Sequence, residues 1–268
     1  MKISNGTNAQ GQPINVKLVV FDIQTKQFLP GVISQNPNAI DISPTGQWLA
    51  ILPHGTVPGD LVNINRLYKI SDLAAGDISK PVYVDSCYYN SVRSIGHNGW
   101  AYDKNGDEVL VYQDNRDDWM KAFNPDTGQS YIIFKGGTHT TTYDGQHIAA
   151  IKNPGSNGWF LMSTYGGSGW TKNQLLMFEV KSLTYTEDAN NCTGMGGPNP
   201  VYVPQSDYPR VWRIGASENR YTGSYDTEGF ASINMLNNKI YVGANWNSTD
   251  NLEVYRIELP QNWWTALG

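Results

Sequence analysis

Two histidines stand in similar places of the sequence, His97 in the segment GHNGW and His139 in the segment GGTHT. Imidazole nitrogens bind divalent metals and transfer protons near neutral pH. If both side chains reach one opening, they predict a polar or metal-binding site there. The alternative is that each histidine hydrogen-bonds a neighbouring part of the fold, because a catalytic metal usually has three protein ligands and the spacing marks no third one. His54 and His147 lie in or beside predicted turns and are interpreted as incidental.

Aromatic and amide side chains suggest a second chemistry, the binding of a sugar. Indole rings offer flat apolar faces to sugar rings, while amides bond the sugar hydroxyl groups. The predicted ligand-binding set consists of His97, Trp100, His139, Asn245, Trp246 and Arg93. The competing interpretation is that the tryptophans fill the space between packed sheets.

Four arginines are candidates for pairing with a negatively charged ligand: Arg93, Arg210, Arg213 and Arg220. A guanidinium fork matches the carboxylate of an acidic sugar, although surface ion pairs are its commoner role. The usual catalytic motifs do not occur in a sensible context, whether a nucleophile elbow, a zinc-protease helix, a phosphate loop or a dinucleotide fingerprint. Catalytic residues are therefore not assigned from the sequence.

Composition and charge exclude several classes of protein. The net charge is −5 and the lysines are scattered, so the chain lacks the basic surface that nucleic acid requires. The sequence contains no run of about 18 apolar residues, so membrane insertion is not predicted. The segment after Met1 is polar and does not read as a signal peptide, while sequons at Asn5, Asn191 and Asn247 are typical of an extracellular or periplasmic setting. Cys87 and Cys192 are interpreted as two free, half-buried thiols, because they are too few for a metal cluster.

The composition predicts an all-β protein. Trp 9, Tyr 16 and Phe 7 favour strands, Gly 27 and Pro 14 supply turns, and charged residues make up only 16%. Four segments repeat the pattern of a β-hairpin: NAIDISPTGQWLAILP, GHNGWAYDKNGDEVLVYQ, THTTTYDGQHIAAI and FASINMLNNKIYVGANW. Their turns are predicted at PTG, KNG, DG and NN, which all tolerate the positive φ angles of tight hairpins.

A further strand pair is predicted after three of the hairpins, in VNINRLYKISDL with KPVYVDSCYY, in WMKAFNPDTGQSYIIF and in NQLLMFEVKSLTYT, and a last strand in NLEVYRIELP. Four-stranded units that recur about every 40 to 45 residues are typical of β-propeller blades. We therefore predict one β-propeller domain over 1–268 with about five or six blades, or part of a larger ring. The Gly-, Asn- and Pro-rich segment 187–208 is predicted to be a long surface loop. Both chain ends fall in mid-blade, so one blade completed by the two ends is an alternative to a truncated ring.

From His97 to Pro260 the chain resembles secreted bacterial β-propellers related to oligogalacturonate lyases and to the propeller domains of Tol-type proteins. The segments that carry the resemblance are GHNGWAYDKNGDEVLVYQ, NPDTGQ, GGTHTT, GWFLMSTYG, ASINMLNNKIYVGANW and EVYRIELP. The resemblance implies that histidines from successive blades converge near a central channel and hold a divalent metal. By motif position His97 and His139 match two of these histidines, whereas Phe230 stands where relatives often have a third.

Three functions remain open at this point. The first is a propeller that binds a glycan or a protein partner through aromatic and Asn-rich loops at one face, with no cofactor. The second is a polysaccharide-active enzyme of the oligogalacturonate-lyase type, with a divalent metal at a channel-mouth site. The third is a structural module of a larger assembly.

Overall fold

The computed structural model describes residues 2–4, 6, 16–34, 37–53, 66–84, 95–114, 119–134, 145–149, 151, 155, 157–166, 170–181, 209–223, 228–234, 236–246 and 252–267. These residues form strands and turns with two short helices, which confirms the all-β prediction. The chain divides into two compact units, one of Met1–Ser94 with Asp188–Gly194 and one of Ile95–Glu187 with Met195–Gly268. Neither described helix is long and apolar enough to cross a bilayer.

The amino-terminal unit contains one four-stranded sheet and two smaller ones. The four-stranded sheet has the order β6 (Pro37–Ile42), β7 (Trp48–Pro53), β8 (Arg66–Lys69) and β9 (Val82–Tyr83). The smaller sheets are β1 (Lys2–Ile3), β2 (Lys17–Leu18) and β5 (Ile33–Ser34), and the pair β3 (Phe21–Asp22) and β4 (Gln27–Phe28). Strand β8 ends at Lys69, and helix α1 (Ile70–Ala74) takes the place of the strand that was predicted to continue there.

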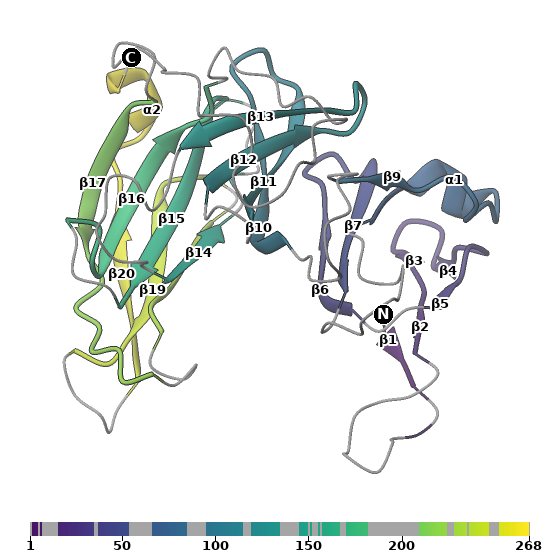
Figure 1. Ribbon diagram of the computed structural model, residues 1–268, viewed down its shortest axis with the longest axis horizontal. Helices are drawn as coiled ribbons and strands as arrows, with labels where there is room; N and C mark the ends of the chain where they lie inside the picture. Colours follow the sequence, from purple (N-terminus) through teal and green to yellow (C-terminus); the bar gives the residue numbers. More distant parts are fainter. Residues whose placement is uncertain are drawn as a thin grey trace, which may run out of the picture. The chain divides into compact units, whose positions relative to one another are not determined.

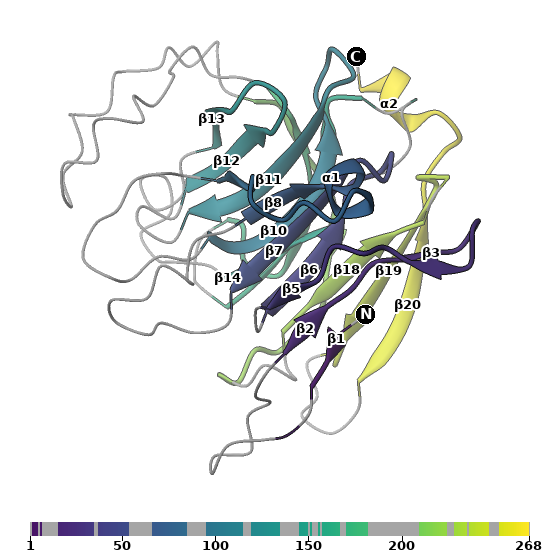
Figure 2. The same cartoon turned by 90° about the vertical axis from the view of Figure 1, so that its right-hand side faces the viewer.

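The carboxy-terminal unit contains three antiparallel sheets that follow one another along the chain (Figure 1). The first consists of β10 (Ile95–Tyr102), β11 (Glu108–Asp114), β12 (Trp119–Asn124) and β13 (Gln129–Phe134). The second consists of β14 (Gly145–Ala149), β15 (Trp159–Tyr165), β16 (Gln174–Glu179) and β17 (Val211–Ala216). The third consists of β18 (Phe230–Ile233), β19 (Lys239–Ala244) and β20 (Glu253–Glu258), which run side by side in Figure 2.

Asx side chains close three of the tight turns in this unit. Asp103 Oδ1 accepts hydrogen bonds from the backbone N–H of Asn105 and Asp107 in the β10–β11 turn, where Gly106 adopts a φ of 91°. The carboxamide oxygens of Asn124 and Asn234 accept in the same way in the β12–β13 and β18–β19 turns. These turns lie at the predicted positions, because a short side-chain acceptor and a residue that tolerates positive φ are both encoded locally.

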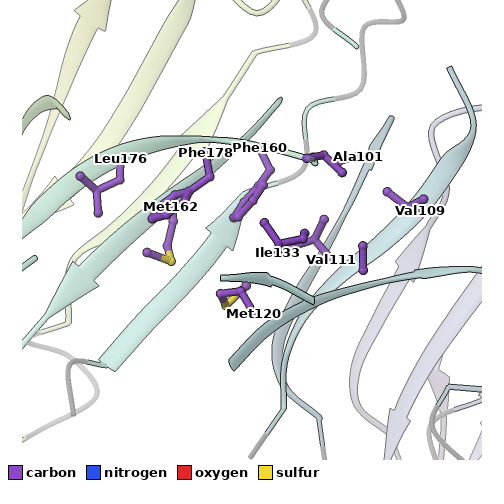
Figure 3. Packing of buried hydrophobic residues seen from close by; sticks show 11 residues of the cluster. Ala101, Val109, Val111, Met120, Ile133, Phe160, Met162, Leu176 and Phe178 are labelled. Atoms are coloured by element: carbon purple, nitrogen blue, oxygen red, sulfur yellow. The ribbon is translucent and has the colours of Figure 1, made fainter. Parts of the chain in front are cut away.

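The first two sheets of the unit pack face to face. Phe160 lies fully buried between them and stacks on Phe178, with ring centroids 5.4 Å apart. Figure 3 shows the two sides of this core, with Phe160, Met162, Leu176 and Phe178 from the second sheet against Ala101, Val109, Val111, Met120 and Ile133 from the first. A second core joins the opposite face of β14–β17 to the β18–β20 sheet. Sheets stacked in chain order, with one sheet buried on both faces, are the packing expected of propeller blades.

Residues near the carboxy terminus pack against the last two sheets at one end of the unit. Helix α2 (Trp263–Ala266) places Trp263 in the second core, where its ring meets Trp159 edge to face at 6.1 Å. Arg210 pairs with both carboxylate oxygens of Glu179, donates to the Leu267 carbonyl and lies over the Trp159 ring. Despite burial of its carboxyl, the Arg210 partner holds the pKa of Glu179 below its usual value.

One predicted strand pairing in the second sheet was wrong. The NQLLMFEVKSLTYT segment does not fold back on itself, since β16 pairs with β15 on one edge and with β17 of 211–216 on the other. The partner of β16 thus lies far along the chain, where local sequence patterns do not reveal it. At the DG turn predicted within 138–151, Gly145 opens β14 and pairs with Tyr165 of β15, while the residues before Gly145 lie outside the described residues.

Other predictions stay open. The long loop predicted at 187–208 lies outside the described residues. The single-domain prediction, the blade count and the shared closing blade also stay predictions. Cys87, Cys192 and the three sequon asparagines lie outside the described residues as well.

Candidate functional site

The first strand of each sheet in the carboxy-terminal unit is called an inner strand. These inner strands, β10, β14 and β18, begin at the same end of their sheets. Strand β14 contacts β10 on one side and β18 on the other. Because every sheet is antiparallel, the starts of β10, β14 and β18 lie with the ends of β11, β15 and β19. We call this end of the three sheets, with the loops that join their strands there, the site end.

One aromatic ring from the start of each inner strand enters a cluster of rings, which we call the ring cluster. The ring centroids of His97 on β10 and His147 on β14 are 4.2 Å apart, and those of His147 and Phe230 on β18 are 4.0 Å apart. Tyr165, at the end of β15, also stacks on His147, with ring centroids 5.1 Å apart and an interplanar angle of 27°. The inner strands therefore bring residues 97, 147 and 230 together.

His147 is hydrogen-bonded to a buried carboxylate. Its Nε2 lies 2.8 Å from Oε2 of Glu228, and both side chains are only 10% exposed. Burial lowers the pKa of His147 to about 3, and the nearby His97 adds to the shift. The carboxylate opposes this change, but burial also raises the pKa of Glu228. We take the lowered direction for His147, so its neutral ring donates the Nε2 proton to Glu228.

The backbone around Glu228 is fixed by neighbouring strands. Ser163 on β15 donates its hydroxyl proton to the carbonyl of Gly229, with 2.9 Å between the oxygens. A Cβ atom at Gly229 would lie 3.2 Å from Oγ of Ser217, so the segment before β18 passes close to the segment that follows β17. In this position Glu228 faces His147 and Tyr165. The Tyr165 hydroxyl donates a hydrogen bond to the carboxylate of Glu228.

An exposed tyrosine lies over the end of this cluster. Tyr221 is 40% exposed, and its ring centroid is 5.1 Å from that of Tyr165. The ring also covers Gly166, where a Cβ atom would lie only 3.1 Å from Tyr221 Cδ1. Gly166 has a φ of 72°, so both its conformation and the room above it favour glycine. Tyr221 is thereby held in one place with part of its ring open to solvent.

Three asparagines hold the segment that carries Tyr221. Asn173 donates its side-chain amide to the carbonyl of Asn219 and accepts at its own backbone carbonyl from Ser217 N–H. Asn245 accepts from the backbone N–H of Arg220 at 2.7 Å and donates to the Arg220 carbonyl at 3.0 Å. Asn219 completes the set by accepting from Asn245 N–H. These bonds replace the ladder that a strand would supply, and they fix the backbone on both sides of Tyr221.

Trp246 follows Asn245 and is the second exposed ring at the site end. It is 52% exposed and adopts a φ of 47°, which a bulky residue rarely takes. Its ring lies 5.1 Å from that of Tyr255. Since Tyr221 and Trp246 each follow a member of the hydrogen-bonded pair Arg220 and Asn245, the two exposed rings flank the same pair.

The structure separates the predicted ligand-binding residues into different roles. Trp246 is exposed at the site end, and His97 belongs to the ring cluster, where it is tilted at 47° to His147. Trp100 is fully buried within its sheet, which favours packing over ligand contact. Asn245 is also buried and uses both amide atoms on Arg220, which favours a positioning role. His139 and Arg93 lie outside the described residues.

His147, Glu228, Tyr165 and Tyr221 were not predicted. The predicted place of His147 in or beside a turn was wrong, because His147 lies within strand β14. With β14 starting at Gly145, His147 stands near the start of an inner strand, as His97 does. The sequence held one usable signal for this, namely the alternative turn residues in NPGSNG between 153 and 158.

The described residues do not fit a metal centre. No group of three His, Cys, Asp or Glu side chains suitable for a metal occurs among them. Of the predicted pair His97 and His139, only His97 is described, and its neighbour His147 directs Nε2 to Glu228. The predicted metal site at His97 and His139 stays a prediction.

Comparison with known proteins supports the fold. The sequence matches no protein-family model and no curated protein. Among solved structures it is similar to an oligogalacturonate lyase in complex with manganese, with a TM-score of 0.53 and 14% identity over 93% of this chain. The chain spans 55% of the length of that lyase. The fold is thus all-β and propeller-like, with small antiparallel sheets, as the sequence predicted.

Proposed function

We propose that this protein is a carbohydrate-binding propeller module that holds a glycan at the site end, on the exposed rings of Tyr221 and Trp246. The observation that carries the proposal is that both rings are partly open to solvent while the backbone beside them is fixed by asparagine side chains. Ligand binding gains from such preorganisation, because little conformational freedom is left to lose. Aromatic faces beside amide and hydroxyl groups suit the apolar and polar sides of a sugar ring.

A charged neighbour of the Tyr221 ring extends the range of sugars that would fit. Arg220 directly precedes Tyr221 in the chain, and its side chain is exposed. The guanidinium group is suited to a carboxylate or sulfate on the glycan. An extracellular or periplasmic location is consistent with this function and stays a prediction.

A glycan array followed by titration tests the proposal. Wild-type protein should bind at least one class of glycan, and Tyr221→Ala and Trp246→Ala should each weaken the best hit about tenfold or more, as removal of a central aromatic contact does. The matched control is Trp212→Ala, which removes a Trp that is 42% exposed on β17. Wild-type affinity in both site-end variants would contradict the proposal.

The same protein should also be incubated with polygalacturonate, with and without Mn²⁺, and watched for the absorbance of unsaturated products. Product that grows with time would show a polysaccharide-active enzyme rather than a binding module. Absence of every glycan interaction would contradict the proposal and would leave binding of a protein partner or a structural role in a larger assembly.

A further inference from the structure

Tyr165 is the residue that joins the exposed platform to the buried cluster. The ring centroid of Tyr221 lies 5.1 Å from that of Tyr165. The His147 ring stacks on the Tyr165 ring, also with 5.1 Å between the centroids. The Tyr165 hydroxyl donates to Glu228, which also accepts from His147 at 2.8 Å. The ring of Tyr165 is therefore fixed by a stack and by a hydrogen bond at its hydroxyl end.

Glu228 and His147 lie too deep to form much contact with a large ligand, since each side chain is 10% exposed. Their contacts run to Tyr165, to each other and to the rings of His97 and Phe230. We infer that Glu228 and His147 are positioning residues, which set the place of the Tyr221 ring through Tyr165 and so determine how tightly the glycan binds. The ligand-binding part of this inference rests on the proposed function.

The charge on Glu228 determines whether this arrangement holds. Among the residues that the structure describes, the titratable groups that face Glu228 are His147 from β14 and Tyr165 from β15, with His97 from β10 next to His147. An ionised Glu228 accepts from both of its partners, whereas the protonated acid donates one proton and competes with them. Burial raises the pKa of Glu228, while the Tyr165 hydrogen bond opposes the rise. The Tyr221 ring should therefore shift as the pH falls through the titration of Glu228.

A measurement without ligand tests the positioning role by itself. Protein carrying 3-fluorotyrosine gives a ¹⁹F resonance for Tyr221, which is assigned by its loss in Tyr221→Phe. In wild type this resonance should move with pH in the acidic range, and in Glu228→Gln it should be displaced at neutral pH and stay constant as the pH falls. A resonance that follows the same pH curve in wild type and Glu228→Gln would overturn the inference, whatever the protein binds.

Titration with the best glycan of the array gives the second readout. Glu228→Gln and His147→Phe should each bind about tenfold more weakly at neutral pH, the size expected for loss of a buried hydrogen bond. Glu179→Gln is the matched control, because it neutralises a partly buried carboxylate on β16, at the opposite end of the sheet that carries His147 and Tyr165. Unchanged circular dichroism in Glu228→Gln separates this effect from unfolding.

The outcomes distinguish the two proposals. If wild type binds a glycan and Tyr221→Ala loses it, but Glu228→Gln and His147→Phe keep wild-type affinity, the positioning inference fails and the proposed function stands. If no glycan binds, while the fluorine resonance responds to Glu228→Gln as expected, the proposed function fails and the positioning role stands.

Discussion

Replacing Phe160 with alanine should lower the free energy of unfolding of the carboxy-terminal unit by about 3–5 kcal/mol. Phe160 is fully buried on β15, belongs to the core between the first two sheets and stacks on Phe178. Its removal leaves a cavity that neighbours such as Val111 and Ile133 fill only in part, because they belong to a different sheet. The loss is large because one side chain joins two sheets.

Urea denaturation followed by tryptophan fluorescence measures this change. Of the nine tryptophans, Trp48 alone belongs to the amino-terminal unit. Tryptophan fluorescence therefore reports chiefly on unfolding of the carboxy-terminal unit. Phe160→Leu is the matched control and should cost less than about 1.5 kcal/mol, since it keeps most of the buried volume. A loss below about 1 kcal/mol for Phe160→Ala would mean that the two sheets do not share this core.

The carboxy-terminal unit should lose stability as the pH falls from about 6.5, the usual pKa of histidine, toward 3, the value that burial gives His147. The folded state keeps the ring neutral, whereas the unfolded chain takes up a proton over this range. Protons therefore favour unfolding, and the loss is on the order of a few kcal/mol, since each unit of pKa shift corresponds to about 1.4 kcal/mol.

Glu228 acts in the opposite direction. Its pKa is raised in the folded state, so uptake of a proton by Glu228 favours folding as the pH falls. This contribution offsets part of the loss from His147. His147→Phe keeps a ring in the ring cluster but has no group to titrate, so its stability should be lower at pH 7.5 and should change less between pH 6.5 and 4.

Urea midpoints at several pH values give this comparison directly. Tyr241→Phe is the control, because it alters an exposed tyrosine on β19, away from the His147 cluster. An equal decline of stability in wild type and His147→Phe would contradict the assignment of the acid sensitivity to His147.

The sequence predicted the elements that are encoded locally. The turns at Gly46, Gly106 and Asn237 were predicted because each needs only a residue that tolerates positive φ and a nearby short polar side chain. The strands on either side of them follow from apolar and aromatic residues in short runs. Repetition of these hairpins was enough to predict the all-β, propeller-like fold.

The site was predicted only in part, since it depends on which strands pair. Glycine at 145 looks like a turn residue, and only the pairing with Tyr165 shows that it opens an inner strand. Tyr221 and Glu228 lie in segments without strand periodicity, and their places follow from contacts with Asn245, Gly166 and His147 that are distant in sequence. Single-sequence patterns do not hold this information.

Hydrogen–deuterium exchange with and without the best glycan tests the central claim that ligand binds at the site end. Exchange should become slower in peptides that contain Tyr221 and Trp246, with little change in β12 and β13. Protection concentrated on β12 and β13, or on the opposite end of the sheets around Arg210, would contradict this claim.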